Sequence, residues 1–145
     1  CTIAQFYPFD GYRATAIGII PPILNFKVIN SIVTGYHDDE VVWTSPKNDE
    51  VCNFSFDHCV LRTEKMNTED SLKFTNTIYE NLKDTTQFGE KHFRLFDTDN
   101  LKYDFRLRKE SAAIGVADTA TSLPTDRRGV LRDDKPDAGC YEFDE

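Results

Sequence analysis

The chain has 145 residues and a formal net charge of −8 at pH 7. A chain of this length fits one domain. Leu, Ile, Val and Phe make up about a quarter of it, above the roughly 20% below which chains tend to stay disordered. The acidic charge argues against nucleic acid and anionic membrane surfaces as partners. The longest apolar run, residues 16–24, is shorter than the about 20 residues of a transmembrane helix, so no transmembrane segment is expected.

The N-terminal residues 1–7 have the pattern of a strand, with no polar residues leading into it. A mature lipoprotein also begins at a cysteine, but it normally continues into a flexible polar tether. The sequence shows no signal-peptide pattern. These observations favour a fragment of a larger chain over a mature lipoprotein.

Three five-residue segments with a similar pattern, which we call words, repeat along the chain. They span residues 29–33, 56–60 and 75–79, and residues 1–4 fit a fourth word that lacks its first two residues. Each complete word has Asn or Asp at its second place, namely Asn30, Asp57 and Asn76, and apolar or β-branched residues at its fourth and fifth. The same strand pattern, repeated at unequal intervals, predicts a stack of coils. Stacked coils bury together the apolar faces that no single coil can bury alone.

The Asn or Asp of each word has a physical use in such coils. These residues tolerate a left-handed bend, and their side chains form local hydrogen bonds that replace backbone ones. A side chain of this kind also reaches the equivalent residue one coil away. We therefore expect Asn30, Asp57 and Asn76 to lie in register as a structural ladder.

Other strands are expected between and after the words. The expected strands are residues 41–43, 74–79, 93–96, 103–107 and 140–143. The second of these, 74–79, lies in an ambiguous stretch, because Leu72, Ile78 and Leu82 have helical spacing, but the third word also lies there and favours a strand. Residues 45–50 and 63–71 have the composition of polar loops.

The four cysteines give no motif. They are Cys1, Cys52, Cys59 and Cys140. They form no C-x-x-C pair, and the three histidines show no zinc-ligand spacing. We expect the cysteines to act mainly as small buried apolar residues. A disulfide between Cys52 and Cys59 stays open as an alternative, and a metal site is the least favoured reading.

The C-terminal third carries four motifs. They are Tyr-Asp-Phe-Arg-Leu at 103–107, Ser-Ala-Ala-Ile-Gly-Val-Ala-Asp at 111–118, Thr-Asp-Arg-Arg-Gly-Val-Leu-Arg at 125–132 and Asp-Ala-Gly-Cys-Tyr-Glu at 137–142. This ending resembles the closing signature of bacterial right-handed parallel β-helix proteins and is similar to the choice-of-anchor Q group. Asn-Ser-Ile-Val-Thr-Gly at 30–35, followed by Asp39-Glu40, resembles a coil of that group.

The resemblance covers residues 1–64 and 93–145, with three departures. Ala113 stands where proline is usual, Val116-Ala117 lengthens the glycine turn, and Cys140 replaces the usual alanine. These departures affect the expected turn geometry more than the expected fold.

The resemblance implies an all-β fold, a right-handed parallel β-helix. It implies a single domain over 1–145, with coils over 1–110, loop insertions near 63–72 and a closing segment over 111–145, and it implies that upstream coils of the same parent chain are missing here. The alternative is a β-sandwich, in which the strands at Asn30 and Asp57 would pair antiparallel.

The closing segment has a physical role in this expectation, because an open stack of coils exposes strand edges that need a cover. Gly115, Gly129 and Gly139 are expected at its turns. Its arginines and aspartates are expected to pair and seal the open end, with an ordinary charged surface as the alternative. They are Arg127, Arg128, Arg132, Asp126, Asp133, Asp134 and Asp137.

Four residues are candidates for ligand binding: Tyr36, His37, Asp38 and Trp43. Exposed aromatic rings stack on sugars, and the acids of 37–40 attract Ca²⁺, although a structural turn is the favoured reading of Asp39-Glu40 and a core position that of Trp43. Tyr7 and Tyr12 are further candidates for sugar stacking.

No catalytic residue is assigned. Residues 97–100 begin like a calcium loop, but Lys102 and Arg108 stand where Gly and Glu are required. We expect no cofactor, with Ca²⁺ as the weak alternative. The sequence contains no G-x-S-x-G elbow and no Gly-rich phosphate loop.

The function expected from the resemblance is that of the C-terminal part of a secreted or cell-surface bacterial protein, structural and polysaccharide-binding. The protein would be lipid-anchored through its missing N-terminal part. One alternative is the tail of a polysaccharide lyase or glycoside hydrolase with its catalytic residues upstream, so the question of an enzyme stays open. Another is an adhesin-like interaction module.

Overall fold

The computed structural model describes residues 1–7, 9, 14–65 and 69–144. The fold is all-β, and its described residues contain no helix long and apolar enough to cross a membrane. The strands are β1 (Thr2–Gln5), β2 (Ile17–Ile19), β3 (Ile23–Ile29), β4 (Ile32–Gly35), β5 (Val41–Trp43), β6 (Cys52–Asp57), β7 (Val60–Leu61), β8 (Phe74–Thr75), β9 (Ile78–Tyr79), β10 (Phe93–Asp97) and β11 (Lys102–Leu107). Two short 3-10 helices are η1 (Glu69–Lys73) and η2 (Gly89–His92).

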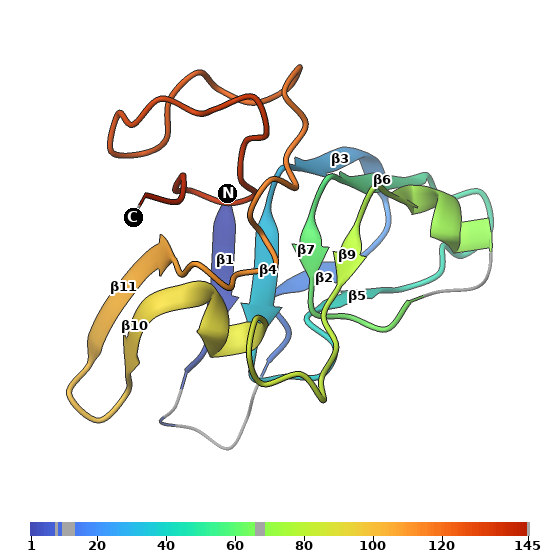
Figure 1. The fold of residues 1–145 in the computed structure, drawn as a ribbon. Helices are drawn as coiled ribbons and strands as arrows, with labels where there is room; N and C mark the ends of the chain where they lie inside the picture. The colour runs from blue at the N-terminus through green and yellow to red at the C-terminus, as the bar shows by residue number, and fades with distance from the viewer. Residues whose placement is uncertain (8, 10–13, 66–68, 145) are drawn as a thin grey trace.

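Three parallel sheets contain the first nine strands. Sheet A has the order β1-β4-β7-β9, sheet B is the pair β2-β5, and sheet C has the order β3-β6-β8. The chain visits A, B and C in turn, and we call one such visit a pass (Figure 1). The third pass is shorter, because no strand among the described residues between β7 and β8 continues sheet B. The remaining strands, β10 and β11, form an antiparallel hairpin.

Residues that pair with one another across the strands of a sheet form a row. Each row joins equivalent residues of successive passes. In sheet A, Thr2 pairs with Ile32, Ile32 with Val60, and Val60 with Ile78. All of these pairings are parallel. The strands that end beside Asn30 and at Asp57, β3 and β6, are parallel as well, which contradicts the antiparallel pairing expected for the β-sandwich alternative.

Each repeated word lies at a corner between sheet C and sheet A. Asn30, His58 and Asn76 have positive φ values of 52°, 50° and 48°, in the left-handed region where Asn and His are enriched. The register pairs Asp57 with the residues just before Asn30 and Asn76. The expected ladder is therefore corrected at its middle position: His58 lies at the corner, and Asp57 is the last residue of β6.

The residue after each corner fixes the bend. Ser31 Oγ, Cys59 Sγ and Thr77 Oγ1 each donate a hydrogen bond to the carbonyl two residues earlier, at 2.7, 3.2 and 2.9 Å. Asp57 links two corners, since its Oδ1 accepts a hydrogen bond from Asn76 Nδ2 at 3.0 Å. A short polar side chain at this place thus supplies the local bond that a sharp corner needs.

The core lies between the three sheets. Val33, Phe56 and Leu61 are fully buried there, and the rings of Phe56 and Phe74 stack at a centroid distance of 5.3 Å. Residues from all three sheets therefore contribute to one core. Its buried members are Ile19, Val33, Val41, Phe54, Phe56, Cys59, Leu61 and Phe74.

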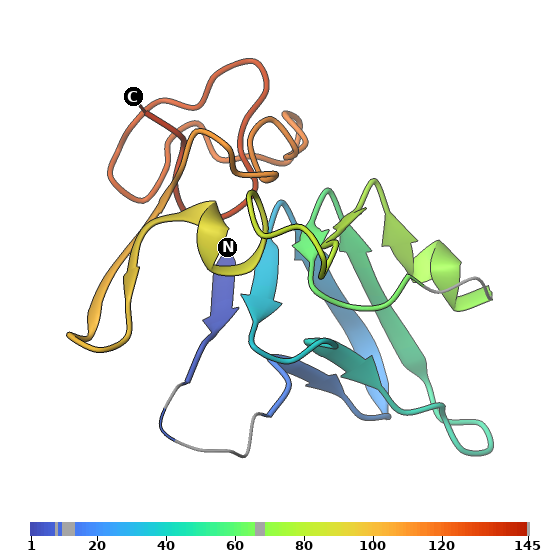
Figure 2. The ribbon, with the colours of Figure 1, turned by 60° about the horizontal axis from the view of Figure 1, so that its bottom comes forward.

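The closing segment covers the outer face of sheet A. Ile32 and Val60 point away from the core and form a second buried cluster with Leu107, Ala113 and Ala138. Sheet A is thus buried on both faces, as parallel sheets usually are. Figures 1 and 2 show the segment on the β1–β4 side of the sheet, with β9 at the opposite side. The segment covers a face, and not the last strand as expected.

The closing segment has no regular strands, and residues 140–143 do not form the expected one. Their backbone N–H groups bind side chains instead of a neighbouring strand. Cys140 N donates to Thr2 Oγ1 at 3.1 Å, Glu142 N to Asp126 Oδ2 at 3.1 Å, and Phe143 N to Asp137 Oδ2 at 2.6 Å. Side-chain acceptors thus take the place of a β-ladder in this segment.

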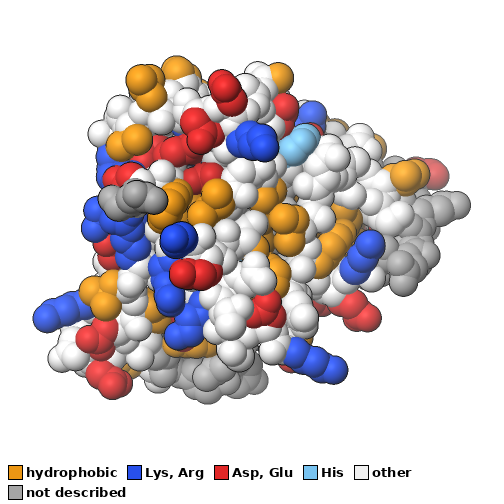
Figure 3. All heavy atoms as spheres, in the orientation of Figure 1, with side chains coloured by type: hydrophobic (Ala, Val, Ile, Leu, Met, Phe, Trp, Pro, Cys, Tyr) orange, Lys and Arg blue, Asp and Glu red, His pale blue; other side chains and the backbone are white. Residues whose placement is uncertain are grey.

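Buried carboxylates organise these turns. Asp126 Oδ1 accepts hydrogen bonds from the backbone N–H groups of Arg128 and Val130, at 2.7 and 3.0 Å. Burial alone would raise the pKa of Asp126, but these donors and the Arg128 guanidinium outweigh it and hold the pKa below its usual value. Glu142 forms an ion pair with Arg132 at 2.8 Å. Figure 3 shows acidic and basic side chains side by side over this part of the surface.

We predict that Gly139→Ala destabilises the fold by about 2 kcal/mol or more. The three glycines of the closing segment, Gly115, Gly129 and Gly139, have φ values of 67°, 83° and 103°. At Gly139 an added Cβ would also lie 2.8 Å from Thr2 Oγ1 and 3.0 Å from Ile32 Cδ1. Urea unfolding measures the change.

The matched control is Gly18→Ala in β2. A Cβ at Gly18 meets no atom within 4 Å, so its stability should stay within about 1 kcal/mol of the original chain. Equal stabilities of the two variants would contradict the close packing of Gly139 on sheet A.

Candidate functional site

A groove of about 220 Å³ lies beside Tyr36, which follows β4. The Tyr36 ring packs edge-on against Phe6 at a centroid distance of 5.0 Å. The groove combines aromatic surface with charged and polar groups, as small-molecule sites do. Its lining residues are Phe6, Gly35, Tyr36, Arg62, Leu82, Asp84, Thr85, Phe88, Gly89, Glu90 and Lys91.

Arg62 connects the groove to the predicted residues His37 and Asp38. Its Nε donates a hydrogen bond to the His37 carbonyl at 2.9 Å, and its Nη2 lies 3.9 Å from Asp38 Oδ1. Its Nη1 lies 3.1 Å from Glu80 Oε2, and the Glu80 side chain is fully buried. The guanidinium is therefore held in one position at the side of the groove.

A buried chain of hydrogen bonds continues from Arg62 into the protein. Glu80 Oε1 lies 3.0 Å from His92 Nε2, and His92 Nδ1 lies 2.8 Å from Ser111 Oγ. Burial alone would raise the pKa of Glu80, but His92 and Arg62 outweigh it and hold the pKa below its usual value. These hydrogen bonds connect Glu80, which follows β9, with His92 in η2 and with Ser111, the first residue of the closing segment.

Glu80, His92 and Ser111 are the residue types of a serine-hydrolase triad, but their geometry is that of a structural contact. Both ring nitrogens of His92 are used, and Glu80, His92 and Ser111 are all buried, so Ser111 Oγ does not face a cavity. Sequence reasoning missed Glu80 and His92, because they are far apart in sequence and share no motif. Only Ser111 carried a signal, as the first residue of the C-terminal motif at 111–118.

Glu40 supports the turn that carries His37 and Asp38. Its fully buried carboxylate accepts hydrogen bonds from the backbone N–H groups of Ala16 and His37, each at 2.8 Å. Burial raises the pKa of Glu40. The Glu40 carboxylate thus serves the turn. The described residues contain no group of three or more His, Cys, Asp or Glu side chains placed to hold a metal ion.

The structure does not bring Trp43 to the groove. Trp43 packs against Phe54 and Phe74 at centroid distances of 5.6 and 5.5 Å, on the edge of the core. This packing is the core position that the sequence favours for Trp43, and a ligand role for its ring stays a prediction. Tyr7 is exposed, packs on Phe9 and does not line the groove. Tyr12 lies outside the described residues.

The calcium-loop-like residues form the turn of the β10–β11 hairpin. Asp97 Oδ1 accepts a hydrogen bond from Asn100 N at 3.0 Å, and its Oδ2 accepts one from Asn100 Nδ2 at 2.9 Å. The Asp97 carboxylate therefore serves this turn.

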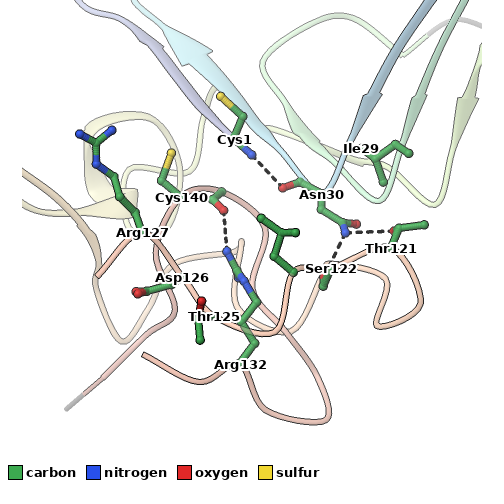
Figure 4. A pocket seen from close by; sticks show the side chains of 12 residues that line it. Cys1, Ile29, Asn30, Thr121, Ser122, Thr125, Asp126, Arg127, Arg132 and Cys140 are labelled. Carbon is green, nitrogen blue, oxygen red and sulfur yellow. Dashed lines mark hydrogen bonds between the residues drawn. The ribbon is translucent and has the colours of Figure 1, made fainter. Parts of the chain in front are cut away.

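A second cavity, of about 460 Å³, lies between the corner at Asn30 and the closing segment (Figure 4). Asn30 Nδ2 donates hydrogen bonds to Thr121 Oγ1 and Ser122 Oγ at 3.1 and 3.0 Å. Arg132 Nη2 donates one to the Gly139 carbonyl at 3.0 Å. These contacts attach the closing segment to the corner, so the cavity belongs to a structural joint.

The four cysteines of the chain are free.

Comparison of the chain with protein-family models, with curated proteins and with solved structures finds no match.

We predict that Glu80→Gln destabilises the fold by about 3–5 kcal/mol, because it leaves the buried side of Arg62 without its anionic partner. The folded-state pKa of Glu80 lies below its ordinary value of 4.5, so its stabilising effect is present above pH 4.5 and is lost as the pH falls. The stability difference between the variant and the original chain should therefore shrink below pH 4.5. Urea unfolding between pH 3 and 7 measures it.

The control for this prediction is Glu110→Gln. Glu110 is exposed and lies 3.7 Å from Arg108, and a surface pair of this kind contributes at most about 1 kcal/mol. A similar loss in both variants would refute the role assigned to the buried chain.

Proposed function

We propose that the chain is the closing part of a right-handed parallel β-helix with a structural and polysaccharide-binding role. The observation that carries the architectural part is the order in which the chain visits its sheets. Three parallel sheets are entered in the order A, B, C, A, B, C. A chain that pairs each strand with its equivalent one pass later advances along one axis, as stacked coils do.

The right hand of the helix is inferred from a general rule. Crossover connections between parallel strands of one sheet are right-handed in about 98% of cases. In this chain β1 and β4 are adjacent and parallel in sheet A, and β2 and β3 lie in the connection between them. The closing motifs at 111–118, 125–132 and 137–142 supply the other support, through their resemblance to the endings of bacterial β-helix proteins.

The same resemblance is the basis for proposing a secreted or cell-surface protein with further coils upstream of Cys1. The proposal of a structural role is supported by the closing segment, which covers the outer face of sheet A and is anchored by the buried carboxylates of Asp126 and Asp137. A polypeptide held in this way contributes to stability more directly than to chemistry.

Polysaccharide is the ligand class that we propose for the Tyr36 groove. Phe6, Tyr36 and Phe88 provide aromatic surface there, and Arg62 and Glu90 provide polar groups. Sugar rings present both apolar faces and hydroxyl groups, so they need this combination. Arg62 is already held by Glu80, which keeps a hydrogen-bonding group in place without a ligand.

The architecture is tested by NMR spectroscopy of the chain in solution. Short backbone proton distances are expected between Ile32 and Val60 and between Val60 and Ile78, in the pattern of parallel strands. A structure calculated from such data also gives the hand of the coils. Antiparallel contacts, or a left-handed connection from β1 to β4, would refute the β-helix.

We predict that Tyr36→Ala weakens polysaccharide binding about tenfold, equivalent to about 1.4 kcal/mol, because one aromatic face is lost. Affinity electrophoresis against a panel of acidic and neutral polysaccharides measures the effect. The control is Tyr103→Ala, which removes an exposed ring on the hairpin. If the original chain binds none of these polymers, or if the two variants bind equally, the groove is not the site.

The lyase alternative has its own readout in the same panel. A lyase leaves an unsaturated uronate that absorbs ultraviolet light, whereas binding alone leaves the absorbance unchanged. Release of such a product by the 145-residue chain would replace the structural proposal with an enzymatic one.

A further inference from the structure

In sheets A and C, core-facing residues of the first pass are less completely buried than their partners in the second. Ile3 in β1 is half-buried, whereas its partner Val33 in β4 is fully buried. The same difference separates the half-buried Val28 in β3 from its partner Phe56 in β6, which is fully buried. Because the paired residues lie in the same rows, the difference arises from what lies beside each pass. In sheets A and C the strand of the second pass has a neighbouring strand on both sides, whereas the strand of the first pass has one on a single side.

The backbone of β1 has an edge that faces away from β4. At Thr2 this edge is partly occupied, because Thr2 N donates a hydrogen bond to Cys140 Sγ at 3.2 Å. Ile32 N donates to the Cys1 carbonyl and Tyr36 N to the Gln5 carbonyl, so the odd-numbered residues of β1 face β4. In a parallel ladder the intervening residues point the other way. The N–H and C=O groups of Ala4 therefore face away from β4, and an outward-facing strand edge of this kind can accept another strand.

Two hollows lie along this edge. One, of about 310 Å³, is lined by Thr2, Ala4, Phe105, Arg127, Cys140 and Tyr141. The other, of about 380 Å³, is lined by Ala4, Gln5, Phe6, Tyr7, Phe9, Phe96, Leu101, Tyr103 and Phe105. They share Ala4 and Phe105, so they form one groove between β1 and the hairpin, which lies beside β1 in Figures 1 and 2.

The groove is lined by apolar side chains that remain exposed. Tyr7, Phe9 and Leu101 are 55%, 66% and 56% exposed. An apolar surface of this kind, next to an outward-facing strand edge, marks an interaction site more often than a solvated face. It also fits the outward side chains of one more strand, which would lie beside those of Thr2 and Ala4.

We infer that this groove is the seat of one further coil of polypeptide, which leads directly into Cys1 and adds a parallel strand to β1. The inference rests on the proposed β-helix and deepens it by specifying the partner. The pairing of equivalent residues in each row defines which side chains the incoming strand must have. It has a left-handed Asn or His in the row of Asn30 and His58, an apolar inward residue in the row of Val33 and large apolar outward residues that fill the two hollows.

The chain itself supplies the probe for this inference. Residues 30–58 form one complete pass, and Val60 pairs with Ile32 as Ile32 pairs with Thr2. A copy of residues 30–58 placed directly before Cys1 therefore brings the copied β4 strand into register with β1. The matched control carries the same residues in scrambled order, with the same composition and charge.

The readout is amide hydrogen exchange at Ala4, followed by NMR. In the extended chain the Ala4 N–H gains a partner, so its exchange is expected to slow by tenfold or more relative to the scrambled control, with a rise in the midpoint of thermal unfolding. Ala4→Pro in the extended chain should remove that rise, because proline has no N–H to donate. Equal exchange at Ala4 in the extended and scrambled chains would overturn the inference.

The same data separate this inference from the proposed fold. Val33 and Leu61 lie inside sheet A, and their amides are expected to exchange slowly in every variant. Slow exchange there with no change at Ala4 refutes the docking of a further coil but leaves the β-helix standing. Fast exchange at Val33 and Leu61 refutes the β-helix itself. Concentration-dependent association of the unextended chain through this edge would assign the groove to a second copy and would also overturn the inference.

Discussion

The rest of the structure depends on one constraint, the apolar outer face of sheet A. Ile32 and Val60 alternate with Val33 and Leu61 along two short strands, and all four are fully buried. A sheet that is apolar on both faces needs a cover on each. The three sheets enclose one face, and residues after the hairpin must return to cover the other. The path of the last third of the chain follows from this requirement.

A covering segment without strands must satisfy its backbone by other means, because buried N–H groups without partners are costly. In this protein carboxylates do so. Asp126 accepts backbone hydrogen bonds from three residues, and Asp137 accepts them from Gly115 and Phe143. Burial raises the pKa of Asp137, helped by the nearby charges of Glu142 and Asp133, and the two N–H donors only partly offset it. The acidic motifs of this segment are thus its substitute for a ladder.

The sequence was informative where a signal was local and repeated. Strands such as β5 and β11 follow from short apolar patterns, and the three words marked the corners. The repeated words did not predict which residue of the second word is equivalent to Asn30 and Asn76. That residue is His58, which tolerates a left-handed bend as well as Asp57 does. Residues 140–143 have a strand pattern, and only the tertiary partners of their N–H groups exclude a strand. The contacts of Arg62, Glu80 and His92 join residues with no pattern in common, so no sequence spacing predicts that part of the candidate site.

The corners also explain how this architecture tolerates change. Alignment between passes is set by a left-handed residue, the hydroxyl or thiol that follows it and two apolar residues of sheet A. The polypeptide between one corner and the next contributes little to that alignment, and the described residues of the third pass include no strand in sheet B. Evolution is therefore free to lengthen, shorten or replace the outer loops of individual turns, and new surface chemistry can arise there while the stacked rows stay aligned.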